Sequence, residues 1–410
     1  MTASDLSQAN LIQDAVAAIG DGPLTEAGVA AHVVPLFSRV LARRATAIDL
    51  ANHSLGRPLD ATASDVAEAI ALWQVRLGDA WHPWLAEMNA HRARLARLLG
   101  APRADCIVPK TSAGQGLRAI LNSYDTVPRV IATRGEFDSV DLILRHYARR
   151  GRIELDFVEP RDDGLFAAED LLAAVREGAD LVVVSHVLFN TGQVLPELPT
   201  FISAAHASGA RVLLDVYHSL GVFPVDVAAL DVDFAIGGSY KYLRGGPGAC
   251  YLYLHPRHLD GSLSTLDIGW FAKPDPFAYE RPDPPRFAPG GDAFFESTPA
   301  ILPLYQARAG QVFTLAIGVK RLRAYSLAQQ RRLVALLREH GAEAAGGTED
   351  RGAFAIVRDA NAVRLAATLE AGGIHSDARG PYLRLCPDVL TTDAELDSAV
   401  RSLAEARAQC

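Results

Sequence analysis

Lys241 is the residue of this sequence whose setting most clearly suggests chemistry. It lies in the glycine-rich run GGSYKYLRGGPG, between the apolar stretches Val232–Ile236 and Ala249–Leu254, which we predict to be strands. Lysine is rarely buried without a polar task. One such task is to form a Schiff base with the aldehyde of pyridoxal phosphate. Taken alone, the pattern fits a surface turn with an incidental lysine equally well.

Asp215 and His218 precede this lysine in the run RVLLDVYH, where Asp215 ends a predicted strand. A buried, unpaired carboxylate is costly, so Asp215 calls for a cation or a hydrogen-bond donor. The protonated ring nitrogen of pyridoxal phosphate is such a partner. His218 is placed to orient either Asp215 or the cofactor.

Thr111 and Ser112 lie where a strand gives way to a helix, in the run PKTSAGQG. Hydroxyls and free N–H groups at a helix N-terminus suit a phosphate group. The run is neither a Walker motif nor a GxGxxG dinucleotide fingerprint. A plain helix cap that binds no ligand explains it as well.

Two further polar sites lie in loops. Asn52, His53 and Ser54 end a short apolar run before Gly56, as either a cap or a binding loop. Asn190 follows the predicted strand Leu181–Ser185. We expect Asn190 near the substrate, because ligands of such sheets lie beyond the carboxyl ends of the strands.

Short apolar runs alternate with helical patterns from residue 107 to residue 254, which predicts an α/β domain with a mostly parallel sheet covered on both faces. Thr111, Asn190, Asp215 and His218 all follow predicted strands, and Lys241 follows the next one. Residues 299–341 read as helical, and the remainder reads as a small α+β domain. We expect an N-terminal helical segment packed on the small domain (1–45), a large domain (46–300), a connecting helix (301–330) and a small C-terminal domain (331–410).

The composition excludes several classes of protein. The chain has 40 basic and 48 acidic residues, a net charge of −8, and its basic residues are scattered, which argues against nucleic acid as a partner. No apolar run is long enough for a membrane span. The N-terminus does not resemble a signal peptide. The four cysteines lack CxxC spacing, which argues against a zinc site or a disulfide framework and favours the cytoplasm.

Six stretches, in this order, resemble the class V aminotransferase superfamily of fold-type I pyridoxal-phosphate enzymes, and within it most closely the kynureninase family. They are NHSLGRP (52–58), DVYHSLG (215–221), VDFAIGGSYKYLRGGPG (232–248), DIGWF (267–271), FESTP (295–299) and LRLCP (383–387). The resemblance implies the fold-type I architecture, with a seven-stranded sheet in the large domain. It also implies a homodimer with active sites at the subunit interface.

The resemblance implies a role in cofactor binding for nine residues. Lys241 would hold the cofactor and move protons, Asp215 and His218 would serve its ring nitrogen, and Phe137 would stack on the ring. Thr111, Ser112 and Tyr240 would bind its phosphate. Trp270 and Thr298 would come from the neighbouring subunit and reach the phosphate or the substrate.

The resemblance also implies a substrate, an L-amino acid. Arg384 would hold its α-carboxylate with the paired N–H groups that a lysine lacks. His53 and Ser54 would lie near an aryl group, and Tyr240 would polarise a ketone.

The implied reaction is hydrolysis of the Cβ–Cγ bond of L-kynurenine or 3-hydroxykynurenine to alanine and anthranilate or hydroxyanthranilate. Another class V reaction on a different amino acid, by an aminotransferase, lyase or racemase, is the alternative. A protein that keeps the fold and only binds is a third reading, disfavoured by the joint presence of Lys241, Asp215 and Arg384. Cysteine desulfurase is also disfavoured, because 375–380 contains no cysteine.

Overall fold

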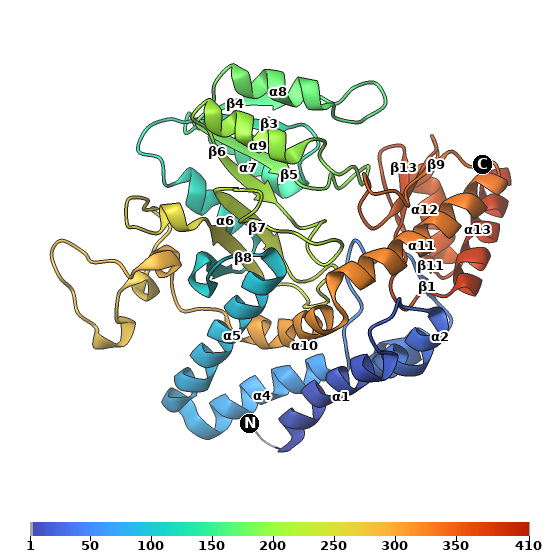
Figure 1. Cartoon of the computed structure of the whole chain (residues 1–410), viewed down its shortest axis with the longest axis horizontal. Coiled ribbons are helices and arrows are strands. Elements are labelled where there is room, and N and C mark those ends of the chain that lie inside the picture. Colours follow the sequence, from blue (N-terminus) through green and yellow to red (C-terminus); the bar gives the residue numbers. More distant parts are fainter. Residues whose placement is uncertain (1–2, 410) are drawn as a thin grey trace.

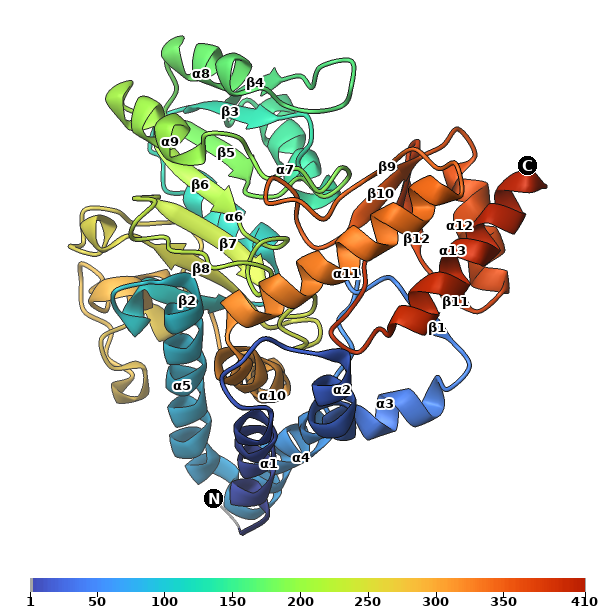
Figure 2. The same cartoon turned by 45° about the vertical axis from the view of Figure 1, so that its right-hand side comes forward.

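The structure is a computed structural model that describes residues 3–409. Its centre is a seven-stranded sheet of order β2-β8-β7-β6-β5-β3-β4, in which β8 alone runs antiparallel to its neighbours (Figures 1 and 2). This confirms the predicted, mostly parallel sheet. The strands are β2 (Ile107–Lys110), β3 (Arg129–Thr133), β4 (Glu154–Val158), β5 (Leu181–Ser185), β6 (Arg211–Asp215), β7 (Phe234–Gly238) and β8 (Cys250–Leu254).

Helices cover both faces of this sheet because neighbouring strand residues point to opposite sides. Val182 and Val184 of β5 pack in one apolar core and Val183 packs in the other. The first core is covered by α5 (Trp81–Leu99), α8 (Ala168–Arg176) and α9 (Leu198–Ala207). The second is covered chiefly by α6 (Ala113–Leu121) and α7 (Asp138–Arg149).

The C-terminal part is the α+β domain that the sequence predicts. Its antiparallel sheet has the order β12-β13-β10-β9. The strands are β9 (Ala344–Ala345), β10 (Ala355–Arg358), β12 (Asp377–Arg379) and β13 (Tyr382–Leu385), with helices α12 (Ala362–Ala371) and α13 (Asp393–Ala408).

A small parallel pair joins the two ends of the chain. Strand β1 (Ile48–Asp49) pairs with β11 (Ile374–His375), so the residues just before His53 lie on the C-terminal domain. Residues 48–49 therefore pair with the C-terminal domain before the chain enters the central sheet. The expected large domain, which begins at residue 46, does not include this pairing.

Two successive helices connect the domains, where the sequence analysis expects a single connecting helix over 301–330. They are α10 (Ile301–Ile317) and α11 (Val319–Glu339), and Gly318 between them has a φ of +89° that favours glycine. Helix α11 extends from the central sheet to the C-terminal domain (Figure 2), where Leu333, Val334 and Leu337 enter the core.

The N-terminal segment packs mainly on α10. It comprises α1 (Ala3–Ile19), α2 (Glu26–Gly28), a π-helix (Val29–Val33), a 3₁₀ turn (Val34–Phe37), α3 (Ser38–Arg43) and then α4 (Ala61–Arg76). The helical segment breaks into three pieces over 29–43, where Pro35 lacks an N–H group. Phe37 packs edge-on against Phe313 of α10, and the same core includes Val389 and Leu390 of the C-terminal domain. Within residues 3–409 no helix has the length and apolar character needed to cross a membrane.

Candidate active site

A cavity of about 200 Å³ lies beyond the carboxyl ends of the central strands. Seven of the residues singled out from the sequence line it together: Thr111, Ser112, Phe137, Asp215, His218, Tyr240 and Lys241. The parallel sheet places them there, because β6 and β7 end side by side and α6 begins at the same edge.

Lys241 is buried in this cavity and its amine has a low affinity for protons. Its Nζ lies 2.6 Å from His218 Nε2. Burial lowers the pKa of Lys241 to about 7, against the opposing effect of the nearby Asp215 carboxylate. A substantial fraction of the amine is therefore neutral near pH 7, as attack on an aldehyde requires.

Asp215 supplies the carboxylate opposite this amine. Its Oδ1 accepts a hydrogen bond of 2.8 Å from the Tyr217 N–H, whereas Oδ2 accepts none within residues 3–409. Burial raises the pKa of Asp215 to about 6. A buried carboxylate with a free oxygen beside a cavity is suited to a cationic N–H donor.

His218 contacts Lys241 and not Asp215, although the sequence analysis offered only Asp215 or the cofactor as its partner. Burial lowers the pKa of His218 well below its usual value, so the imidazole is neutral. Its Nδ1 lies 3.2 Å from the Tyr242 hydroxyl and its Nε2 faces Lys241. With the proton on Nδ1, the ring donates to Tyr242 and accepts from Lys241.

The predicted phosphate position is a true helix start. Ser112 caps α6, and its Oγ accepts a 3.2 Å hydrogen bond from the Gln115 N–H. The Thr111 N–H and hydroxyl both donate to Gln115 Oε1, at 2.7 and 2.8 Å. Both residues are exposed and line the cavity, so an anion bound there would meet the start of α6.

Aromatic rings surround the amine, and the sequence reasoning missed two of them. Lys241 Nζ lies 5.4 Å from the centre of the predicted Phe137 ring and 5.0 Å from that of Tyr217. Phe189 packs edge-on against Phe137 at 5.4 Å. Tyr217 follows Asp215 by two residues, so its nearness to a strand end was the available signal.

Glu136 is a buried acid behind this wall that the sequence reasoning also missed. It accepts hydrogen bonds from the Ser185 N–H at 3.1 Å and the Ser185 hydroxyl at 2.6 Å, and from the Thr133 hydroxyl. Burial raises the pKa of Glu136 to about 7. These bonds fix the loop that presents Phe137.

Arg384 and His53 meet at a second acid, Asp377, next to this cavity. Arg384 donates from Nε to Asp377 Oδ1 at 2.7 Å and from Nη2 to Oδ2. His53 Nε2 lies 2.8 Å from Asp377 Oδ1, and burial lowers the pKa of His53 to about 4. Two of the four residues predicted to bind substrate are thus brought together from opposite ends of the chain.

Four other predicted residues lie outside the wall of the cavity. Ser54 is exposed in the loop beside His53, and Asn190 turns its Oδ1 back to accept from the Thr191 N–H. Trp270 donates from Nε1 to Thr298 Oγ1 at 3.2 Å. Thr298 lines a neighbouring cavity that shares Thr111 and Gly248 with the one around Lys241.

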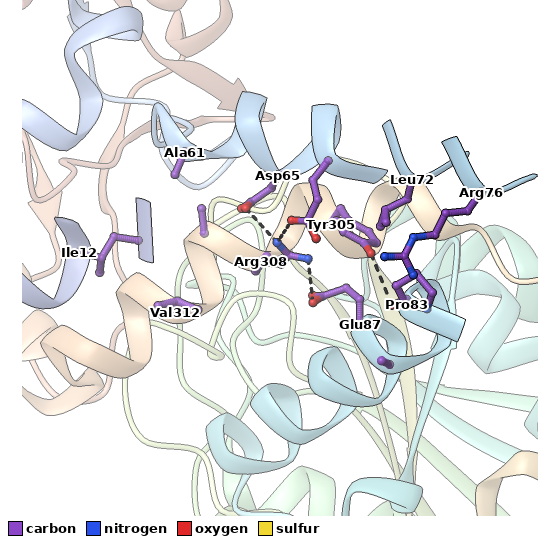
Figure 3. A pocket seen from close by; sticks show the side chains of 13 residues that line it. Ile12, Ala61, Asp65, Leu72, Arg76, Pro83, Glu87, Tyr305, Arg308 and Val312 are labelled. Carbon is purple, nitrogen blue, oxygen red and sulfur yellow. Dashed lines mark hydrogen bonds and ion pairs between the residues drawn. The ribbon is translucent and has the colours of Figure 1, made fainter. Parts of the chain in front are cut away.

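A larger cavity of about 390 Å³ lies between α4, α5 and α10, away from Lys241 (Figure 3). Arg308 projects into it and pairs with Asp65, Glu68 and Glu87. The three acidic residues are thus already paired with Arg308, and among residues 3–409 no lysine lines the cavity. The cavity around Lys241 is therefore the candidate active site.

This site fits pyridoxal 5'-phosphate. A partly neutral buried lysine, a carboxylate with a free oxygen and a helix start occupy one cavity, as the aldehyde, the ring nitrogen and the phosphate require. The fold and the site define a pyridoxal-phosphate-dependent enzyme of fold type I.

Comparison with known proteins agrees with this class. Residues 79–401 match the family model described as aminotransferase class-V, and the chain belongs to that family. It is 28% identical over 364 residues to the kynureninase of Bacillus thuringiensis subsp. konkukian, which covers 84% of each chain. It is 33% identical over 269 residues to the kynureninase of Deinococcus radiodurans, which covers 63% of each.

Solved structures share the fold at lower identity. The cystine C–S lyase C-DES in complex with cysteine persulfide has a TM-score of 0.78 at 20% identity, covering 90% of this chain and 99% of that one. The apo cysteine desulfurase of Thermococcus onnurineus NA1 has a TM-score of 0.76 at 19% identity, covering 89% and 95%. C-DES has also been solved with glycine linked to its pyridoxal-phosphate cofactor.

Proposed function

We propose that this protein is a kynureninase-like hydrolase. It would use one water molecule to cleave the Cβ–Cγ bond of L-kynurenine or 3-hydroxykynurenine, giving L-alanine and anthranilate or 3-hydroxyanthranilate. The observation that carries the proposal is the similarity to named kynureninases over 84% of each chain.

Bound pyridoxal phosphate supplies an electron sink for the substrate's α-carbon. Asp215 would hold its ring nitrogen, Phe137 its ring face, and Thr111, Ser112 and Tyr240 its phosphate. The free oxygen of Asp215 and the exposed start of α6 support these assignments.

Lys241 would anchor the cofactor and carry the proton removed from the α-carbon. Its pKa of about 7 supports this role, because a base with a pKa near the working pH transfers protons in both directions. His218, 2.6 Å away and neutral, would hold Nζ in place and accept its hydrogen bond.

Arg384 would bind the α-carboxylate, with His53, Ser54 and Asn190 placing the rest of the substrate. The buried guanidinium close to Phe189, a wall residue of the cavity, supports that assignment. Tyr240 in the same wall would donate to the ketone oxygen while water adds to its carbon.

The cysteines do not favour a desulfurase. Cys386 lies buried at the end of β13, where its thiol contacts the Ala353 carbonyl and burial raises its pKa. Cys250 lines the cavity, but Tyr217 Oη lies 3.2 Å from its Sγ and burial raises its pKa as well. Neither supplies the accessible thiolate that sulfur transfer needs.

We propose that the active protein is a cytoplasmic homodimer. Trp270 and Thr298 of one copy would reach the phosphate or the substrate in the active site of the other. Exposed apolar side chains at the end of α4 and in the following turn support a partner: Trp73, Val75 and Leu77 are 59%, 82% and 69% exposed. The buried, unpaired Cys106, Cys250 and Cys386 support a reducing compartment.

Anthranilate fluorescence tests the proposed reaction. The purified protein with its cofactor should release anthranilate from L-kynurenine, or hydroxyanthranilate from 3-hydroxykynurenine, in amounts equal to the alanine formed. The Lys241→Ala variant should abolish release, and the exposed Lys320→Ala should leave it unchanged. Transamination of either compound without an aryl product would contradict the proposal.

A further inference from the structure

Arg384 is held in place by hydrogen bonds to groups of its own chain. Its side chain is 4% exposed, and three of the five N–H groups of its guanidinium have partners. Two donate to the carboxylate of Asp377, and one, on Nη1, donates to the Phe189 carbonyl. One N–H is left on each Nη nitrogen, which is the number a second carboxylate needs for paired hydrogen bonds.

The C-terminal hairpin builds this ion pair. Asp377 of β12 and Arg384 of β13 are directly opposite each other in the register, so their side chains share one face of the sheet. Gly380, with a φ of +54°, makes the turn between the strands. The pairing is therefore fixed by the backbone and does not depend on a chance meeting of two long side chains.

Asp377 also holds the loop that carries His53. The same Oδ1 atom lies 2.7 Å from Arg384 Nε and 2.8 Å from His53 Nε2. His53 is neutral in this setting, so it donates its Nε2 proton to the carboxylate. The backbone bridge between Ala51 and Cys386 places the loop beside β13.

We propose that Asp377 is the positioning residue of the substrate-carboxylate subsite. It fixes one edge of Arg384, leaves the other edge for the α-carboxylate, and ties both to His53. The inference rests on the proposed role of Arg384, but not on kynurenine as the substrate. If Asp377 has this role, substrate binding depends on the α-carboxylate of the amino acid, because an amide in its place offers Arg384 only one acceptor and no charge.

The test compares L-alanine with L-alaninamide, which differ only at the group that Arg384 would hold. The dissociation constant of each is measured on the holoenzyme from the change in cofactor absorbance. The Asp377→Ala variant should weaken L-alanine binding at least about tenfold. Without Asp377 the guanidinium of Arg384 is no longer held in place, so its paired, charge-assisted hydrogen bonds to the substrate carboxylate are lost. It should change L-alaninamide binding less than about twofold.

Three variants sharpen this test. Asp377→Asn keeps one acceptor, so it should weaken L-alanine binding by an intermediate factor, and it decides the question if Asp377→Ala does not fold. Arg379→Gln removes the exposed arginine 3.5 Å from Asp377 and should leave both constants unchanged. Arg384→Lys, which keeps the charge but not the fork, should repeat the selective loss.

Two results would overturn the inference. Tighter L-alanine binding by Asp377→Ala would show that Asp377 competes with the substrate. Equal losses for L-alanine and L-alaninamide would show a merely structural role. Neither result depends on the cleavage of kynurenine. If no anthranilate is released but Asp377→Ala still weakens L-alanine binding selectively, only the proposed reaction is wrong.

Discussion

At the scale of single residues, burial sets the chemistry of this site. Lys241 and Asp215 lie in a low-dielectric cavity, which disfavours the charged form of both groups. The pKa of the amine falls while that of the carboxyl rises, so the two values approach each other near neutral pH. A cofactor with a cationic nitrogen and an aldehyde would suit both groups, by pairing with the carboxylate and reacting with the amine.

The low pKa of Lys241 predicts how the cofactor-free protein captures pyridoxal phosphate. Only the neutral amine attacks an aldehyde, so the capture rate should rise with pH through about 7, well below the ordinary lysine value of 10.5. Stopped-flow absorbance of the purified apoprotein measures this rate. The Asp215→Asn variant loses the carboxylate that raises this pKa, so its profile should shift to lower pH. A rate still rising near pH 10 would contradict the burial argument.

At the scale of elements, the loop 52–58 is clamped onto the lysine loop. The Gly56 N–H donates to the Tyr240 carbonyl at 2.8 Å. A Cβ atom on Gly56 would lie 2.0 Å from the Lys241 carbonyl oxygen, so this loop position has no room for a side chain. The glycine is therefore required by close backbone approach, which sets the distance between His53 and Lys241.

Gly56→Ala should consequently damage both stability and the site. We expect a loss of roughly 1–3 kcal/mol in the free energy of unfolding, typical of overpacking against groups that cannot move. Urea unfolding and the visible absorbance of bound cofactor measure the two effects. Gly22→Ala is the matched control, since a Cβ atom there meets nothing within 4 Å. Equal behaviour of the two variants would contradict the close packing.

The sequence predicted the elements of the central sheet well because most of its strands are short apolar runs that end in, or are followed by, a polar residue. The same reasoning located Lys241, Asp215, Thr111 and Ser112 at one edge, since the carboxyl ends of parallel strands meet there. It did not find Asp377, because no periodic pattern reveals which residue lies opposite Arg384 in a hairpin. Nor did it reveal that His218 bonds to Lys241, since that depends on the path of a loop.

At the scale of the whole molecule, one buried carboxylate joins the N-terminal loop, the lysine loop and the C-terminal domain. Asp388 pairs with Arg57 at 3.0 Å and with Arg244. All three side chains are at most 9% exposed. The two guanidiniums hold the pKa of Asp388 below its usual value, so it stays charged at neutral pH.

Asp388→Asn should therefore be among the most destabilising single changes in the chain. It leaves two buried guanidiniums without a counter-charge, and breaking such a pair typically costs about 3–5 kcal/mol. Urea denaturation at pH 7 measures the free energy of unfolding. The half-exposed pair between Arg332 and Asp397 is the control, where Asp397→Asn should cost less than about 1 kcal/mol. A similar small effect at both positions would show that the domains are not held together by Asp388.

The pairing of Ile48 with Ile374 has a consequence for how the protein is made. Contacts between residues so distant in sequence form only after the later one has been synthesised. At about 5–20 residues per second, the N-terminal strand waits on the order of tens of seconds for its partner to leave the ribosome. The nascent chain therefore brings Lys241 beside Asp215 first, and gains Arg384 only near the end of translation.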